Sequence, residues 1–359
     1  MEQVHNAMEM LDLMLQPAFC VRDGKIIKVN PPAAAFLIET GAAAETFLHT
    51  GAEEYANFDG GCLYLTLSIG GQNLGASVTR IGDMDVFCIE QIETDAYMQA
   101  MALAAQQLRD PLSNVMTIAD KLFPETAADD PKLREQLSIM NRGLFQMIRI
   151  IGNMSDAGRY ATDTGSRQEI RNITALADEI FSRAMQLTEH TAVSLKYSGP
   201  ADPIYTLADA EKLERMIFNL VSNAIKFSPA GSCIHAVLSR RGNKLYLSIS
   251  DSGNDVDKNA QGTLFSRYQR TPGLEDSRHG LGLGMVLVRT TATLHGGTVL
   301  VDHPQECGTR VTVSLSIRQG DATLRSPGLR IDYTGERDHG LIELSDVLPS
   351  RLYDPELTN

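Results

Sequence analysis

Three polar residues near the middle of the chain stand at helical spacing among apolar neighbours. Asn219, Asn223 and Lys226 are four and three residues apart, so on a helix they share one face. A neutral amide oxygen is a suitable ligand for Mg²⁺, which keeps water and phosphate oxygens as its other ligands. A lysine on the same face can then reach phosphate. Taken alone, such a set more often forms only a solvated helix face.

A second motif is an acid followed by a glycine at the end of a β-type run, Ile249-Ser250-Asp251-Ser252-Gly253. A carboxylate at a strand end can accept a hydrogen bond from an exocyclic amine, and glycine lets a flat base approach the backbone. By itself, an Asp-x-Gly turn is the commoner interpretation of this pair.

A third motif consists of three alternate glycines, Gly280, Gly282 and Gly284, which open an apolar helical run. Unshielded N–H groups at a helix N-terminus attract phosphate through hydrogen bonds and the helix dipole. The spacing differs from that of a Walker loop or a dinucleotide fingerprint. Arg270 lies upstream in a stretch rich in cations, which suits a segment that closes over polyphosphate.

These motifs need a framework, and the sequence from about Ile170 to Ile317 supplies one by alternating helical and β patterns. Two amphipathic helices are predicted before it. Their apolar residues recur at steps of four and three, which predicts a helical hairpin with seams suited to a dimeric four-helix bundle. Packing of these seams within one chain is the alternative. The seam residues are Met101, Ala105, Leu108, Leu112, Val115, Ala119 and Leu122, then Leu133, Leu137, Met140, Leu144, Met147, Ile151 and Met154.

The N-terminal quarter of the chain has a different period. Asp23-Gly24 between two short β-type runs predicts a hairpin, and Asn30 precedes a helical stretch. Three further β-type runs follow at residues 62–69, 73–81 and 84–92. This order, with an Asn opening the helical part, resembles a PAS domain, whose ligand is haem, flavin, a small metabolite or none. The ligand here is unknown; a lone histidine such as His49 is more often a surface or core residue than a haem ligand.

Composition excludes several classes of function. The 359 residues carry 45 acidic against 32 basic side chains, a net charge of -13, which argues against a broad nucleic-acid or anionic membrane surface. No apolar run approaches the roughly 18 residues of a membrane span. The five cysteines form no Cys-x-x-Cys pair, so neither a zinc cluster nor a disulfide framework is indicated. We therefore expect a cytoplasmic protein whose partners are proteins or small molecules. The cysteines are Cys20, Cys62, Cys88, Cys233 and Cys307.

The order of the motifs closely resembles the ATP-binding domain of sensor histidine kinases, in the GHKL superfamily. His295-Gly296-Gly297 and Gly308-Thr309 continue the family's order beyond the glycine loop. The cofactors implied are ATP and Mg²⁺, with Asn223 as the metal ligand. The resemblance gives these further roles: Asn219 beside the metal, Lys226 and Arg270 near phosphate, Asp251 and Thr309 on adenine, Gly253 where the base approaches, and Gly280, Gly282 and Gly284 shaping the loop.

Two departures from the family pattern lie around the nucleotide. Asp255 replaces the second glycine of Asp-x-Gly-x-Gly, and Arg278-His279 stands where Gly-Ser or Gly-Thr is usual. Asp255 adds a negative charge near polyphosphate, so a weakened affinity is predicted.

A larger departure lies in the hairpin, where Gln106-Gln107-Leu-Arg-Asp110-Pro-Leu stands in place of His-Glu-Leu-Arg-Thr-Pro-Leu. Gln106 occupies the position of the acceptor histidine and Gln107 that of the adjacent acid. The imidazole nucleophile and its base are both missing, and residues 98–160 contain no histidine. No catalytic residue is therefore assigned, and Asp110 in place of Thr also puts phosphatase activity in doubt.

The predicted fold is multidomain α+β, with an N-terminal PAS-like antiparallel sheet, a dimeric helical hairpin and a C-terminal α/β-sandwich ATP-binding domain. The function predicted is that of a two-component, histidine kinase-like pseudokinase. The alternatives are a phosphotransferase acting on a partner's acceptor and a nucleotide-free scaffold. A homodimer, a response regulator, a phosphotransfer protein or a partner kinase are the partners implied. The predicted boundaries are 1–94 for the sensor, 95–165 for the hairpin, 166–318 for the ATP-binding domain and 319–359 for an extended or weakly docked tail.

Overall fold

The structure is a computed structural model in which the strands of two regions form one long sheet. Its path runs β2-β1-β6-β5-β4-β12-β13-β11-β10-β8, and β3 pairs with β4 beside this path. The residues described are 8, 11–89, 103–109, 111–119, 131–161, 168–252, 283–304, 308–318 and 337–354.

The N-terminal part of this sheet is antiparallel, as the sequence predicted. Asp23 and Gly24 both have positive φ, 51° and 72°, and form the tight turn between the first two strands. Asn30 is fully buried and caps the following helix by accepting a hydrogen bond from the Ala33 N–H at 3.0 Å. The elements are β1 (Ala18–Arg22), β2 (Lys25–Val29), α2 (Pro31–Ala34), a 3₁₀ turn η1 (Ala44–Phe47), β3 (Leu48–Thr50), α3 (Ala52–Ala56), β4 (Cys62–Ile69), β5 (Gln72–Ile81) and β6 (Met84–Ile89).

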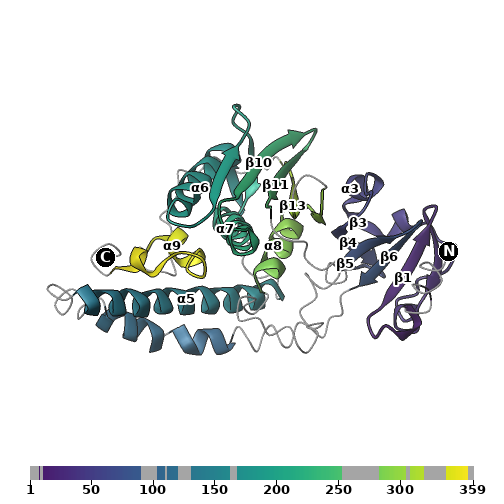
Figure 1. The fold of residues 1–359 in the computed structure, drawn as a ribbon. Helices are drawn as coiled ribbons and strands as arrows, with labels where there is room; N and C mark the ends of the chain where they lie inside the picture. The colour runs from purple at the N-terminus through teal and green to yellow at the C-terminus, as the bar shows by residue number, and fades with distance from the viewer. Residues whose placement is uncertain are drawn as a thin grey trace.

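The second part of the sheet belongs to the segment that carries the predicted nucleotide motifs. Helices α6, α7 and α8 lie on one face of these strands (Figure 1), and their apolar sides form one core cluster with the sheet. A separate two-stranded sheet joins β7 to β9. The elements are β7 (Glu169–Asn172), α6 (Ile173–Thr188), β8 (Ser194–Ser198), β9 (Tyr205–Ala208), α7 (Ala210–Phe227), β10 (Cys233–Arg241), β11 (Lys244–Ser250), α8 (Leu283–Leu294), β12 (Val299–Asp302) and β13 (Arg310–Ser316).

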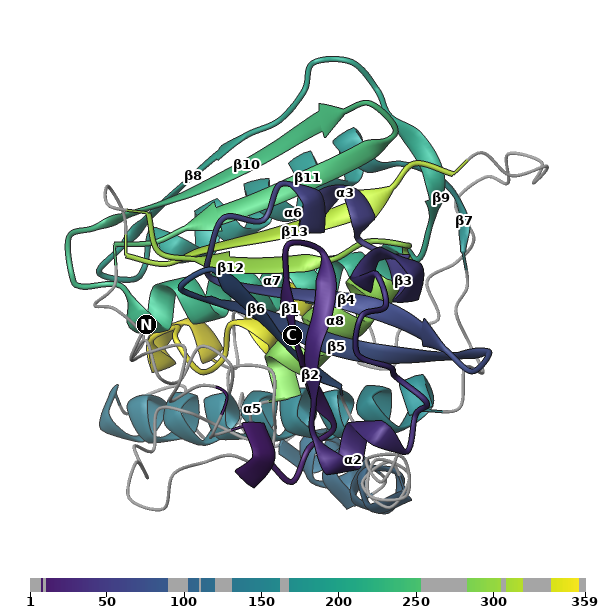
Figure 2. The same ribbon diagram turned by 90° about the vertical axis from the view of Figure 1, so that its right-hand side faces the viewer.

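The two parts are joined edge to edge, which no sequence pattern indicated. β4 pairs antiparallel with β12, placing Tyr64 opposite Val299 and Cys62 opposite Val301 (Figure 2). Side chains reinforce this junction: the Arg289 guanidinium of α8 lies 4.0 Å from the centre of the Tyr64 ring, an attractive cation–π geometry. The two regions therefore share a hydrogen-bonded strand edge.

A pair of long helical segments lies along α8 and the C-terminal helix α9 (His339–Glu343), on the side of the helices away from the sheet (Figure 1). Helix α5 (Pro131–Ala161) is one, and residues 103–109 and 111–119 are helical in the other. Five of the predicted seam residues are buried within the chain: Ala105, Ala119, Leu137, Leu144 and Ile151. Four others are exposed: Leu108 by 50%, Val115 by 51%, Met140 by 49% and Met147 by 44%.

The C-terminal segment, defined here as residues 337–354, differs from the sequence expectation. An extended or weakly docked chain was predicted, and for these residues that is wrong. Leu344, Leu348 and Tyr353 are completely buried, and the Tyr353 ring meets Phe145 of α5 edge to face, with 5.2 Å between centroids. Burial of the apolar side chains between Leu341 and Leu348 explains the docking. The segment contains α9 (His339–Glu343) and a 3₁₀ turn η4 (Ser350–Tyr353).

Candidate nucleotide-binding site

Asp251 and Thr309, 58 residues apart in sequence, meet where β11 ends and β13 begins. Their backbones are bonded through the Asp251 N–H and the Thr309 carbonyl at 2.9 Å. The Thr309 N–H also donates to Oδ1 of Asp251 at 3.3 Å. Both residues are largely buried. The antiparallel register of the two strands, with Ser250 opposite Arg310, thus brings Asp251 and Thr309 together.

Asn219 and Gly284 form a second close pair. Asn219 is 1% exposed, and a Cβ atom at Gly284 would lie 2.8 Å from its Oδ1. Any side chain at position 284 would therefore displace the Asn219 amide. The two residues belong to different sequence motifs, and the packing of α8 on α7 brings them together.

Asn223 and Lys226 follow Asn219 on α7, one and two turns further along, and both are half-buried. The helix starts at Asp209, whose side chain accepts a hydrogen bond from the Lys212 N–H at 3.2 Å. Its apolar residues face the sheet and fix the orientation of the polar ones. Asn219, Asn223 and Lys226 thus belong to one continuous helix, as their spacing predicted.

His295 ties the two helices of the site together. Its Nδ1 lies 2.7 Å from the Thr291 carbonyl oxygen, and the Asp209 N–H points at its Nε2 at 3.1 Å. These contacts require a neutral imidazole that donates through Nδ1 and accepts through Nε2. Burial lowers the pKa of this imidazole below its ordinary value. The histidine therefore fixes the end of α8 against the start of α7.

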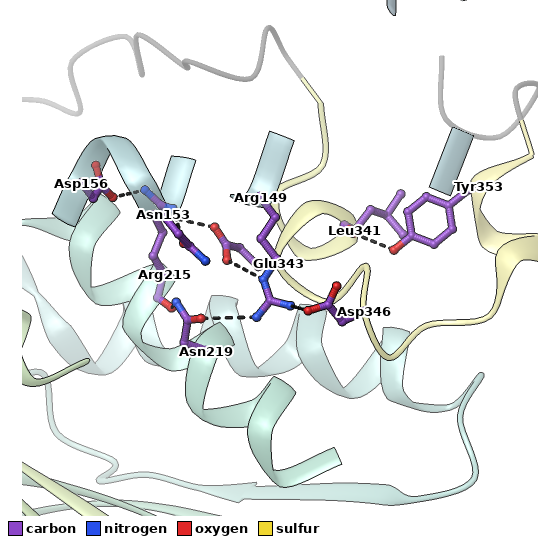
Figure 3. A network of polar contacts seen from close by, with 9 residues as sticks. All are labelled: Arg149, Asn153, Asp156, Arg215, Asn219, Leu341, Glu343, Asp346 and Tyr353. Carbon is purple, nitrogen blue, oxygen red and sulfur yellow. Dashed lines mark hydrogen bonds and ion pairs between the residues drawn. The ribbon is translucent and has the colours of Figure 1, made fainter. Parts of the chain in front are cut away.

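A buried charged network next to Asn219 was missed from the sequence (Figure 3). Arg149 of α5 donates to Oδ1 of Asn219 at 3.3 Å. Asn219 in turn donates to the Arg215 carbonyl one turn earlier on α7, at 2.9 Å. Arg215 stands four residues before Asn219, so it lies on the same polar face of α7. This helical spacing could have predicted Arg215 from the sequence. No sequence motif around Arg149 indicated that it would contact Asn219.

Several predicted site residues lie outside the described residues: Gly253, Asp255, Arg270, Arg278, His279, Gly280 and Gly282. Gln106 and Gln107 are within them. Both stand exposed on the helical segment 103–109.

The described residues fit a nucleotide-bound magnesium ion better than a metal held by the protein alone. They contain no group of three or more His, Cys, Asp or Glu side chains that could hold a metal. Asn223 offers one amide oxygen on the face shared with Asn219. A Mg²⁺ ion bound there would take its remaining ligands from phosphate and water.

Residues 208–319 match the family "Histidine kinase-, DNA gyrase B-, and HSP90-like ATPase". The chain is 29% identical over 226 residues to hybrid signal transduction histidine kinase D of Dictyostelium discoideum, covering 61% of this chain and 15% of that protein. It is also 29% identical over 230 residues to adaptive-response sensory kinase SasA of Microcystis aeruginosa, covering 61% and 59%.

Among solved structures, full-length ShkA in complex with AMPPNP aligns with 63% of this chain and 47% of its own, at 20% identity and a TM-score of 0.48. The chain covers less than two thirds of the length of either curated relative above. None of the described helices has the length and apolar character to cross a membrane.

Proposed function

The chain belongs to the sensor histidine kinase family, and we propose that it is a two-component signalling protein that binds Mg-ATP as a dimer without phosphorylating itself at the usual hairpin position. The observation that carries the nucleotide part is the Asp251–Thr309 pair. A buried carboxylate, oriented by the Thr309 N–H at 3.3 Å, is suited to receive the exocyclic amine of adenine.

Magnesium binding is assigned to Asn223. Its amide oxygen is a hard ligand, and the phosphates would complete the shell. Bound there, the ion would neutralise phosphate charge. The protein's own contribution is the rigid placement of Asn219, Asn223 and Lys226 on α7, held at its start by Asp209 and His295.

Loss of self-phosphorylation follows from the amides at positions 106 and 107. Phosphoryl transfer to a hairpin needs a nucleophilic nitrogen and a group that accepts its proton. A glutamine side chain supplies neither. The exposure of both residues leaves this surface open to a partner such as a response regulator.

Dimerisation is supported by four residues of the hairpin seam that the chain leaves exposed. Leu108 and Val115 are seven residues apart, as are Met140 and Met147, and all four are exposed. Exposed apolar side chains repeated at heptad spacing are typical of a helix that packs against another helix. A second copy of the hairpin would cover them.

The N-terminal sheet is proposed to be a PAS-like sensor with an unidentified ligand. Its strand order β2-β1-β6-β5-β4 and the cap at Asn30 support this interpretation. Cys20, Cys62, Cys88 and Cys233 are free thiols, which suits a reducing compartment such as the cytoplasm.

An active phosphotransferase with its acceptor on another protein is the second candidate. It is favoured by the difference between a preserved nucleotide site and a hairpin without its nucleophile. A scaffold that binds no nucleotide is the third.

Calorimetry on the full chain with ATP, with and without Mg²⁺, tests the proposal. We expect Mg²⁺-dependent binding in the micromolar range or weaker. If no binding is found at millimolar ATP, the scaffold that binds no nucleotide is the remaining candidate. Transfer of label from radiolabelled ATP to a partner histidine would establish the second candidate.

A further inference from the structure

The C-terminal segment places a carboxylate between the hairpin and the ATP-binding domain (Figure 3). Glu343 is 1% exposed. Its Oε1 accepts a hydrogen bond from Nε of Arg215 on α7 at 3.0 Å, and its Oε2 lies 3.6 Å from Nε of Arg149 on α5. One side chain of the segment thus pairs with both regions.

These charged side chains are buried, so the free-energy cost of burying them depends on whether they are paired. Arg149 is 7% exposed and Arg215 is 4% exposed. Arg149 also pairs with Asp346 at 2.7 Å, so among the described residues both of its carboxylate partners come from the C-terminal segment. Arg215 has Asp156 of α5 as a second partner. Loss of the segment would take both of these carboxylates away from Arg149, and a buried guanidinium without a carboxylate is costly.

Backbone groups of the segment are also held by α5. Arg142 donates to the carbonyls of Ser345 and Asp346 at 2.9 Å and 3.0 Å, and Asn141 donates to that of Tyr353 at 2.9 Å. On the opposite side, Gly340 lies so close to Leu187 of α6 and Phe218 of α7 that a Cβ atom would approach them to 2.6 Å and 3.3 Å. The segment therefore contacts the hairpin and the ATP-binding domain at once.

The same network reaches the proposed nucleotide site. Arg149, held by Glu343 and Asp346, donates to Oδ1 of Asn219 at 3.3 Å. Asn219 stands one turn before the proposed metal ligand and contacts the start of α8 at Gly284. A change in the position of Arg149 would therefore alter the hydrogen bonding of a residue within the site.

We propose that residues 337–354 act as an intramolecular strap, which holds the ATP-binding domain against α5 in one orientation and keeps the Asn219 amide bonded to Arg149. Release of the strap lets the domain move and makes Asn219 available to the bound nucleotide. The nucleotide effect rests on the function proposed above, whereas the docking of the strap does not. A ligand that binds the released state better shifts the equilibrium toward it, so strap and nucleotide oppose one another.

The first experiment measures the strap without nucleotide. Hydrogen exchange by mass spectrometry is compared for the full chain, for Glu343→Gln, and for the control Glu135→Gln, which changes an exposed acid on α5. We expect faster exchange in residues 337–354 and in α5 near Arg149 for Glu343→Gln alone, with the N-terminal sheet unchanged. Unchanged exchange in the segment, or equal acceleration throughout the chain, would overturn the strap.

The second experiment measures Mg-ATP affinity on the same three proteins and on a chain ending at residue 336. We expect Glu343→Gln and the shortened chain to bind at least about fivefold more tightly than the full chain, the lower range of common coupling between sites. A peptide of residues 337–354 added to the shortened chain should reverse the gain. Equal affinity in all proteins would overturn the regulatory role. Absence of binding in all of them would refute the proposed function, while the exchange result still decides the strap.

Discussion

The ATP-binding domain and the helical hairpin contrast in what they preserve. In the first, residues matching a nucleotide site lie together: Asp251 bonds to Thr309, and Asn219 packs on Gly284. In the second, the frame of Leu108, Arg109 and Leu112 remains, but amides occupy positions 106 and 107. The contrast teaches that a helix can keep its packing residues while its chemical groups change, because packing depends on shape and transfer on a nucleophile.

The largest expected effect comes from giving the hairpin back the chemical groups that it lacks. Gln106→His with Gln107→Glu is expected to gain phosphohistidine from labelled ATP, whereas the parent gains none, because the pair restores a nucleophile and a base. The measurement is acid-labile, alkali-stable label on the chain. Adding Asn223→Ala to this variant is the control and should abolish the label. Label on the parent would refute the missing acceptor. Proximity governs the rate, since a misplacement of about 1 Å can cost roughly 100-fold.

The next effect concerns the preserved side of the contrast. Asp251→Asn is expected to weaken Mg-ATP binding about 10-fold to 100-fold, because a hydrogen bond to a charged acceptor contributes about 1.5 to 3 kcal/mol. Calorimetry measures the change, and Asp59→Asn, at an exposed position in the N-terminal region, is the matched control. Equal loss in both variants would contradict the assignment of Asp251 to adenine.

The proposed role of the hairpin in dimerisation can be tested by changing the exposed residues of its seam. Met140→Glu with Met147→Glu is expected to convert a dimer into a folded monomer, because charges would enter an apolar interface. Sedimentation gives the mass and circular dichroism gives the fold. Leu144→Glu is the contrasting variant: Leu144 is buried in the core of a single chain, so it should destabilise the fold itself. A native chain that sediments as a monomer would disprove the dimer.

The smallest effect is a pH dependence within the ATP-binding domain. Burial lowers the pKa of His295 in the folded state, so the unfolded chain takes up the proton first as pH falls. This contribution to stability is fully present above the unfolded pKa of about 6.5. It is lost below that value, by up to about 1.4 kcal/mol per pH unit, until the folded state also protonates. Urea unfolding at several pH values measures it, and His295→Gln should show a shallower dependence.

Local patterns predicted several of the elements. The turn at Asp23-Gly24 and the strands near β4, β5 and β6 were recognised because turn geometry and β alternation are local properties. The position of Asn30 at the start of a helix was part of the resemblance to a PAS domain. The joint position of Asp251 and Thr309 was implied only by the resemblance of the motif order. Burial of residues 337–354 was missed, because a short apolar cluster between prolines does not show which surface will cover it.

What the sequence determined by itself is the set of chemical groups: amides on one face of α7, an acid at a strand end, and no imidazole in the hairpin. Tertiary structure alone decided that β4 pairs with β12 and that Glu343 pairs with Arg149 and Arg215. The physical reason is that strand edges and charges have many acceptable partners. With 45 acidic and 32 basic residues in the chain, only the packing of distant helices settles which pairs become buried.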